Sequence, residues 1–248
     1  MEGNNGVAAV DRALLILAAL GRTRKATALA ELAKETGLYR STILRLVASL
    51  SRAGFVQRLD SGLYQLGPTV LQLGQVYQET FRLGDVLGPE LRDLAERTGE
   101  SVSLFVRQGD MRICLYRVDS PRPVREHVRV GEALPLDKGA AGRILLAFTE
   151  PSDPRFDDLR RRMVTWSKGE RASGASAVAC PLFGPEGAIV GAMTVSGLTG
   201  DFDEARAQAL ADLLFGAVVR LTRRVGGDAG KLERAYETFR DARIFGEW

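Results

Sequence analysis

Apolar residues recur at helical spacing twice between Ala28 and Leu50, and a glycine separates the two runs. In the first run, Leu29, Leu32 and Ala33 stand at positions i, i+3 and i+4, which places them on one face of a helix. Gly37 follows, and a residue without a Cβ suits the left-handed conformation in which many helices end. In the second run, the apolar positions i, i+3, i+4 and i+7 are Ile43, Leu46, Val47 and Leu50. The pattern predicts two short helices joined by a tight turn.

The second of these helices has a polar and basic outer face. This face is formed by Tyr39, Arg40, Ser41, Thr42, Arg45 and Ser49. Short polar side chains and arginines at the start of a second helix are the groups that read base edges in the major groove of DNA. We also expect the hydroxyl of Ser41 or Thr42 to cap the first turn. The alternative is an ordinary helical hairpin with a solvated face, and this stretch alone does not decide between them.

A further apolar helix is expected before the hairpin, from Val7 to Leu20. One face of it is formed by Val10, Leu14 and Leu17. We expect Gly21 to end this helix and Thr27 to cap the next one. The hairpin therefore supplies the second and third of three consecutive helices.

Two short β-like runs follow the three helices, at residues 55–56 and 63–66. The turn signal Asp60-Ser61-Gly62 lies between them, so the segment predicts a β-hairpin. A β-hairpin directly after a helix-turn-helix is a wing, which would bring Arg58 near a phosphate of the DNA backbone. Three helices followed by a wing indicate DNA binding more sharply than the helical hairpin does alone.

Basic charge is concentrated in the same part of the chain. Residues 1–82 contain 10 Lys and Arg against 6 Asp and Glu, a net charge of +4, whereas the remainder contains 24 against 25, a net charge of −1. Binding to phosphates requires such a concentration, although many solvated surfaces carry as much.

Pro68 stands where a helix can begin without losing a needed N–H. Apolar residues follow it at helical spacing, namely Val70, Leu73, Tyr77 and Phe81. We interpret residues 68–84 as a linker helix. Its apolar face is expected to contact a second subunit, with packing on its own domain as the alternative.

Beyond the linker, strands and helices do not alternate regularly. Strands are expected at residues 101–107, 111–119, 124–130, 175–183 and 188–197, and helices at 85–97, 139–149, 151–162 and 203–224. This order predicts an α+β domain with a mainly antiparallel sheet flanked by helices. A tail follows Gly226-Gly227, and its apolar residues Leu232, Tyr236 and Phe239 could face the same chain, a partner or neither.

The chemistry of other classes of protein is not visible in the sequence. Cys114 and Cys180 form no CxxC, and no Cys, His or acidic cluster has metal-ligand spacing, so neither a metal nor a cofactor is expected. The only histidine, His127, has no identifiable nucleophile as a partner, so no catalytic residues are assigned. No apolar run is long enough to span a membrane and no signal peptide is recognised, which favours a cytoplasmic protein.

The order of these elements resembles the IclR family of bacterial transcriptional regulators. The resemblance covers Val10 to Arg224. It rests on VDRALLILAAL, ELAKETGLYRSTILRLVASLSRAGFV, YQLGPTVLQLG, ALPLDKGAAGRILLAF, GERASGASAVACPLF and AIVGAMTVSG, in the family's order. It implies a winged helix-turn-helix domain at residues 1–67, the linker at 68–84, an effector-binding domain at 85–225 and a C-terminal tail at 226–248. It also implies a homodimer or homotetramer on a palindromic operator of double-stranded DNA, with a small organic acid as effector.

Small residues before an apolar helix offer backbone amides that an anion could use, and Ala140 and Ala141 are two of these. Thr194 and Ser196 alternate with apolar residues, so their hydroxyls share one face of a strand. The alternative is that small residues only allow close packing here. The resemblance implies that the two amides hold an effector carboxylate and that the two hydroxyls line the same pocket.

The sequence departs from the family pattern at several positions. Ser167 stands where some members have Asp, and Ala177 where one has Cys, so those effector contacts are weakened or replaced. Asp137 stands where His is common, and Leu44 stands where the recognition helix often has His. If Asp137 points inward, it would repel a carboxylate and favour an effector with an amino group, so an amino acid is a candidate beside an organic acid.

The function that we expect is sequence-specific DNA binding, modulated by a small organic or amino acid. The alternative is a small-molecule-binding enzyme or sensor domain whose helical hairpin is not used on DNA.

Overall fold

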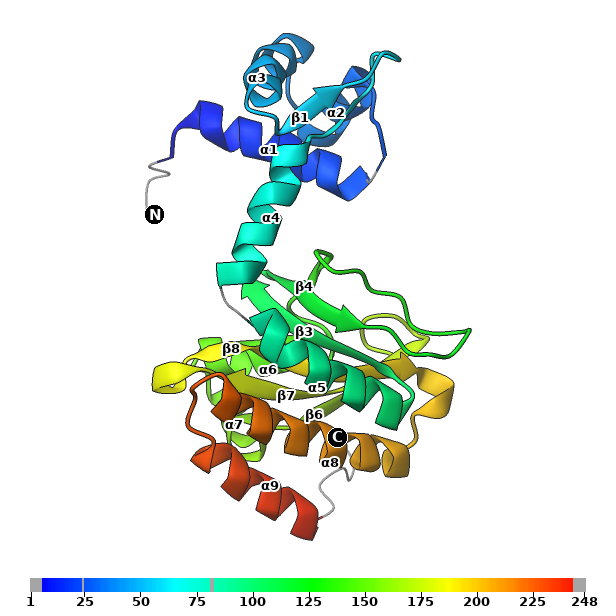
Figure 1. The fold of residues 1–248 in the computed structure, drawn as a ribbon, viewed down its shortest axis with the longest axis vertical. Helices are drawn as coiled ribbons and strands as arrows, with labels where there is room; N and C mark the ends of the chain where they lie inside the picture. The colour runs from blue at the N-terminus through cyan, green and yellow to red at the C-terminus, as the bar shows by residue number, and fades with distance from the viewer. Residues whose placement is uncertain (1–5, 24, 81–82, 243–248) are drawn as a thin grey trace. The chain divides into compact units, whose positions relative to one another are not determined.

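The computed structural model describes residues 6–23, 25–80 and 83–242. The chain divides into two compact units, Met1–Phe81 and Arg82–Trp248, which Figure 1 colours from blue to cyan and from green to red. Each unit has a hydrophobic core of its own. The predicted linker residue Phe81 lies outside the described residues.

The N-terminal unit has the predicted winged helix-turn-helix fold. Its elements are α1 (Ala8–Thr23), α2 (Leu29–Thr36), α3 (Arg40–Arg52), β1 (Val56–Arg58), β2 (Tyr64–Leu66) and α4 (Pro68–Thr80). Its core is formed by Ile16, Ala19, Leu20, Leu32, Ile43, Val47, Val56 and Tyr64. Gly37 has the expected left-handed conformation, with φ 69°, and its N–H donates to the carbonyl of Ala33. β1 and β2 pair antiparallel and form the wing.

The caps predicted for α2 and α3 are wrong. Thr27 does not cap α2, because its backbone pairs with that of Tyr64 in an isolated β-bridge, with N···O distances of 2.8 and 2.9 Å. Neither Ser41 nor Thr42 caps α3, since Tyr39 holds the N-cap position and no side chain accepts a hydrogen bond there. Pairing with a segment distant in sequence thus overrides the local capping preference.

The prediction for α1 is partly wrong as well. The helix continues through Gly21 to Thr23 instead of ending at the glycine. Its buried face consists of Ile16, Ala19 and Leu20. Of the predicted apolar face, Leu17 is half-buried and packs against the core, whereas Val10 and Leu14 are 53% and 57% exposed.

The C-terminal unit is an α+β domain built on one antiparallel sheet. Its elements are α5 (Leu83–Thr98), β3 (Ser101–Gln108), β4 (Met111–Val118), β5 (Ala133–Pro135), α6 (Gly139–Thr149), the 3₁₀ turn η1 (Pro154–Phe156), α7 (Asp157–Arg162), β6 (Thr165–Lys168), β7 (Ala175–Phe183), β8 (Ile189–Leu198), α8 (Glu204–Arg224) and α9 (Gly230–Ala242). The strand order is β5-β4-β3-β8-β7-β6, and every neighbouring pair is antiparallel.

Three local predictions for this unit need correction. The strand predicted at residues 124–130 is not formed, and the segment is a loop between β4 and β5. The short strands β5 and β6 were not predicted. The helix predicted at residues 151–162 is replaced by η1 and the short α7.

The two faces of the sheet carry side chains of different size, because successive residues of a strand point to opposite faces. On one face, the core under α5 and α8 includes Val178, Met193 and Val195. On the other face, the core under α6 includes Ala179 and Ala192. The face under α6 therefore carries small side chains along β7 and β8, and these leave space beside the helix.

The tail packs on its own chain. Leu232 and Phe239 of α9 are fully buried in the core under α8, beside which α9 runs in Figure 1. The ring centroid of Phe215 lies 5.9 Å from that of Phe239 and 5.1 Å from that of Tyr236. A Cβ at Gly227 would lie 2.6 Å from the carbonyl oxygen of Phe183, so the glycine before α9 permits a close backbone contact.

We predict that Phe239→Ala lowers the free energy of unfolding of the C-terminal unit by about 3–5 kcal/mol, because it leaves a cavity beside Phe215. Urea unfolding followed by circular dichroism measures the change. The exposed residue Glu237 of the same helix gives the matched control, since Glu237→Ala should change stability by less than about 0.5 kcal/mol. Equal effects of the two substitutions would show that α9 is not part of the core.

Candidate functional site

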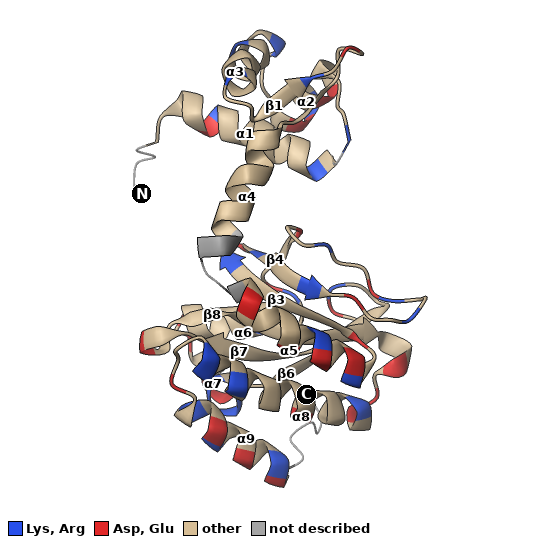
Figure 2. Ribbon diagram, viewed as in Figure 1, with Lys and Arg blue, Asp and Glu red and all other residues tan. Residues whose placement is uncertain are grey.

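The residues predicted to read DNA lie on the outer surface of α3 and on the wing. Those exposed are Tyr39, Arg40, Ser41, Arg45 and Ser49, whereas Thr42 is half-buried. Arg58, the last residue of β1, is also exposed, and its guanidinium lies 5.9 Å from the centroid of the Tyr64 ring. Figure 2 shows basic residues on both α3 and β1.

The arginines of this surface are available to phosphates. Arg40, Arg45 and Arg58 form no ion pair with any residue that the structure describes. The first turn of α3 has no side-chain cap, so its N–H groups keep their capacity to bind an anion. The absence of the predicted cap also leaves the hydroxyls of Ser41 and Thr42 available for contacts with DNA.

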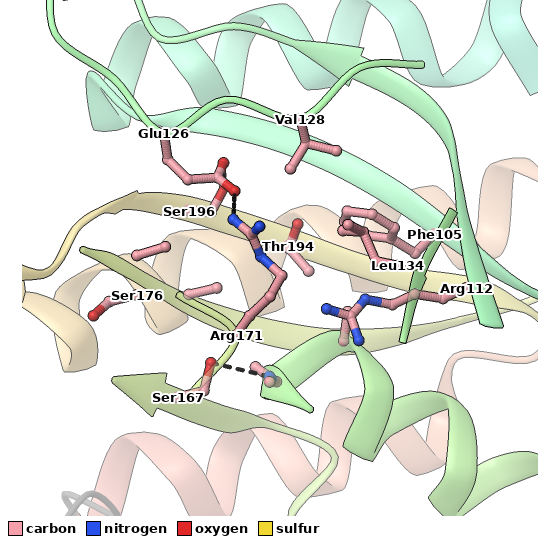
Figure 3. Close-up of a pocket in the computed structure, with 15 residues that line it drawn as sticks. Phe105, Arg112, Glu126, Val128, Leu134, Ser167, Arg171, Ser176, Thr194 and Ser196 are labelled. Atoms are coloured by element: carbon pink, nitrogen blue, oxygen red, sulfur yellow. Dashed lines mark hydrogen bonds and ion pairs between the residues drawn. The ribbon is translucent and has the colours of Figure 1, made fainter. Parts of the chain in front are cut away.

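The residues predicted to bind an effector all line one cavity in the C-terminal unit, drawn in Figure 3. They are Ala140, Ala141, Ser167, Ala177, Thr194 and Ser196. The cavity lies between the start of α6 and the sheet face with small side chains, and its volume is about 40 Å³.

The register of the sheet places three of these residues in one row. Ser167 of β6 pairs with Ala177 of β7, and Ala177 pairs with Ser196 of β8. Thr194 stands two residues before Ser196 and therefore lies on the same face. The start of α6 meets the row at Ser167, whose Oγ accepts a hydrogen bond of 3.0 Å from the N–H of Ala140.

Glycines allow the start of α6 to come this close to the sheet. Gly139 has φ 80°, and its N–H donates to Oε2 of Glu170 at 3.1 Å. A Cβ at Gly142 would lie 2.0 Å from the carbonyl oxygen of Leu136 and 2.9 Å from Nη1 of Arg112. Any side chain at position 142 would therefore push the helix away from the cavity wall.

Arg112 is a site residue that the sequence reasoning missed. It is 3% exposed and lines the cavity, and its Nη1 donates to the backbone carbonyls of Pro135 and Lys138. Its Nε has no hydrogen-bond partner, and it forms no ion pair with a carboxylate in the described part of the chain. Burial, followed by the charge of Arg171, lowers the pKa of Arg112 to about 10, so it is a cation at neutral pH. The cavity wall thus contains a buried positive charge without a counterion.

Glu126, in the loop between β4 and β5, is the second missed residue. It is 8% exposed, and its Oε1 pairs with Arg171. Its Oε2 lies 3.2 Å from Nη2 of Arg117 and accepts a hydrogen bond of 3.3 Å from Oγ of Ser196. Figure 3 shows this carboxylate beside Ser196, joined to Arg171 across the cavity.

The acidic residue at the cavity is therefore Glu126 and not Asp137. Asp137 is exposed and does not line the cavity, so the reason given for an effector with an amino group does not hold. The alternation within residues 124–130 was the available signal, because Glu126 and Val128 are both buried and both line the cavity. For Arg112, the sequence offered one indication of burial, namely an arginine between the apolar residues of a predicted strand.

The titratable groups considered for catalysis have no partners suited to it. Cys114 and Cys180 are buried, and burial raises the pKa of both thiols, that of Cys114 to about 11. His127 is exposed and lies 2.9 Å from Nε of Arg129. Within the described ranges, no group of His, Cys, Asp and Glu could hold a metal ion, and no helix could cross a membrane.

Two family models match the chain. The IclR helix-turn-helix domain matches residues 9–60. The C-terminal domain of bacterial transcriptional regulator IclR matches residues 76–156 and 153–222.

Proteins named as transcriptional regulators are similar to the chain over most of its length. HTH-type transcriptional regulator KipR of Bacillus subtilis is 25% identical over 223 residues, covering 80% of this chain and 89% of the relative. HTH-type transcriptional regulator BhcR of Paracoccus denitrificans is 27% identical over 247 residues, covering 89% of this chain and 88% of the relative.

Solved structures have the same fold. The IclR transcriptional regulator from Alicyclobacillus acidocaldarius matches with a TM-score of 0.77 at 24% identity, over 89% of this chain and 100% of that one. An IclR homologue from Microbacterium hydrocarbonoxydans, crystallised with 4-hydroxybenzoate, matches with a TM-score of 0.73 at 21% identity, over 88% of this chain and 99% of that one.

Proposed function

Since the chain belongs to the IclR family and is a DNA-binding transcriptional regulator, we propose a specific task for each of its two units. The N-terminal unit reads a palindromic operator with α3 and contacts its backbone with the wing. The C-terminal unit binds a small carboxylic acid in the cavity beside α6, and this effector changes the affinity for the operator.

The buried guanidinium of Arg112 is the observation that carries the effector proposal. A buried charge without a counterion is costly, and a bound anion removes that cost. The effector carboxylate would lie against Arg112 and accept from the amides of Ala140 and Ala141, of which the first now donates to Ser167. A small residue at position 177 leaves room for the rest of the molecule.

Two hydroxyl oxygens line the same cavity from β8. That of Thr194 donates to the carbonyl of Ser103 and that of Ser196 to Glu126, so toward a ligand both act as acceptors. The homologue crystallised with 4-hydroxybenzoate supports a carboxylic acid as the class of effector. An organic acid fits better than an amino acid, because the one buried carboxylate that could hold an ammonium group, Glu126, is already paired with Arg171 and Arg117.

We further propose that the chain works as a homodimer, or as a homotetramer made of two dimers, and that it has no catalytic activity of its own. The apolar faces of α1 and α4 support dimerisation, since their exposed members include Val10, Leu14, Leu71, Leu73 and Val76. The neutral buried thiols and the pairing of His127 with Arg129 support the second proposal.

We predict that Arg45→Ala weakens binding to the operator by about 1–3 kcal/mol and leaves the fold intact, because Arg45 projects from the reading helix and can pair with a guanine. Electrophoretic mobility shifts with upstream DNA measure affinity, and circular dichroism checks the fold. Arg234→Ala is the control for the loss of one charge, since Arg234 is exposed in the other unit. Unchanged specific affinity in the folded Arg45 variant would exclude it from recognition.

Arg58→Ala should act differently from Arg45→Ala. As a phosphate contact of the wing, Arg58 adds affinity for every sequence, so its loss should weaken specific and unspecific binding alike. The slope of log K against log salt concentration should fall by about one. A loss confined to the operator would show instead that Arg58 reads bases.

The double variant Leu14→Glu/Leu73→Glu should shift the assembly toward monomers at micromolar concentration in sedimentation velocity, because charges would replace apolar surface on α1 and α4. Val124→Glu provides the control, since Val124 is 70% exposed but lies in the other unit, in the loop between β4 and β5. Operator half-sites about 34 Å apart, or a multiple of that, should bind the wild type and not the double variant. A wild type that sediments as a monomer would contradict the proposal.

The effector site is tested by a thermal-shift panel of carboxylic acids that includes butyrate, benzoate and 4-hydroxybenzoate, followed by calorimetry on the acids that stabilise the protein. Arg112→Met should weaken their binding by about 1.5–3 kcal/mol, the contribution of one charge-assisted hydrogen bond. DNA binding without effector should persist. Arg107→Met is the control, because Arg107 pairs with Glu150 and does not line the cavity. Equal affinities of wild type and Arg112→Met would refute this site.

A further inference from the structure

The carboxylate of Glu126 has the surroundings of a bound anion. It receives a hydrogen bond from Ser196 and ion pairs from Arg171 and Arg117. It reaches this position from the loop between β4 and β5 and lines the same cavity as Arg112. Part of the polar lining is thus already used by the protein's own carboxylate.

The ion pairs around the cavity show which cation still lacks a counterion. Arg117 pairs with both Asp119 and Glu126, whereas the one ion pair that Arg171 forms in the described chain is to Glu126. Glu170 pairs with Arg143 at 2.9 Å, so its negative charge is already compensated and does not neutralise Arg112. Arg112 is the arginine of the lining that forms no ion pair in the described chain, so its positive charge is uncompensated.

We propose that Glu126 determines the charge of the effector, because it fills a second anion position of the cavity and leaves only the position at Arg112 free. The site then accepts molecules with one anionic group and discriminates against dianions. A dianion would have to displace Glu126 and compete with it for Ser196, Arg171 and Arg117. This inference rests on the effector site proposed above.

The second anion position is tested first, without the natural effector. Glu126→Ala vacates the space in front of Ser196 and Arg171, and Arg112→Met removes the other anion position. Acetate should therefore raise the melting temperature of the full-length double variant Arg112→Met/Glu126→Ala by a few degrees in a saturable manner. It should leave that of the single variant Arg112→Met unchanged. No stabilisation of the double variant by acetate overturns the proposal.

Selectivity is tested with butyrate and succinate, which share a four-carbon chain and differ by one carboxylate. Wild type should prefer butyrate, and Glu126→Ala should shift the ratio of the two affinities toward succinate by about tenfold or more. Glu132→Ala is the matched control, since this carboxylate of the same loop accepts from the N–H of Arg129 and is not part of the cavity lining. An unchanged ratio in Glu126→Ala overturns the proposal.

The outcomes separate this inference from the effector site itself. If Arg112→Met weakens butyrate binding but Glu126→Ala leaves the ratio of butyrate to succinate affinity unchanged, the effector site is supported and the proposed role of Glu126 is refuted. If acetate binds the double variant but Arg112→Met leaves butyrate binding unchanged, the proposed role of Arg112 is refuted. The second anion position, at Ser196 and Arg171, is then still supported. Should Glu126→Ala not fold, Glu126→Ser also vacates the second position but keeps one polar atom in the loop, and it should shift the ratio in the same direction.

Discussion

Both faces of the antiparallel sheet in the C-terminal unit must be covered, and the rest of this unit depends on how differently the two faces are packed. Large apolar side chains meet α5 and α8 on one face, whereas alanines and hydroxyl residues meet α6 on the other. The small side chains let the N–H of Ala140, in the first turn of α6, come within hydrogen-bond distance of Ser167. Because these side chains are small, they also leave space unfilled beside α6, and this space is the cavity. The close packing of α6 and the binding site therefore have the same cause.

The buried charges are compatible with this packing because backbone groups hold them. Arg112 donates to two carbonyls in the segment that enters α6, and these bonds fix both the guanidinium and the start of the helix. Arg117 donates to the backbone carbonyl of Glu126 at 2.9 Å as well as to its carboxylate. The loop between β4 and β5 is therefore held at the cavity by polar contacts, and its conformation depends on the charges inside.

Features determined by neighbouring residues could be predicted from the sequence, and features determined by distant pairing could not. Helical periodicity and the conformation of Gly37 are local, and both predictions are confirmed. The cap at Thr27 failed because the backbone there pairs with a strand far along the chain. The alternation around Glu126 matches the burial of Glu126 and Val128 only, since Val124 and Val130 are 70% and 51% exposed, and alternation does not show whether a neighbouring strand is present to pair with.

The candidate effector site shows the same limit. Ala140, Ala141, Thr194 and Ser196 were singled out from local patterns and the family resemblance, and Ser167 and Ala177 from the resemblance alone. Their meeting in one cavity depends on a register that no local pattern contains. Arg112 and Glu126 were missed because a charged residue in a short segment looks solvated until its neighbours are known. Burial of both is a property of the assembled sheet.

The position of α9 has a consequence for how the protein is made. Leu232 and Phe239 complete a core whose other members begin with Leu87, so the C-terminal unit cannot close its core until almost all of that unit has left the ribosome. The N-terminal unit has a separate core and contains none of these residues, and domains generally fold as units in the order of synthesis. The nascent chain therefore presents a folded DNA-reading surface before the ligand-sensing half has taken its final form.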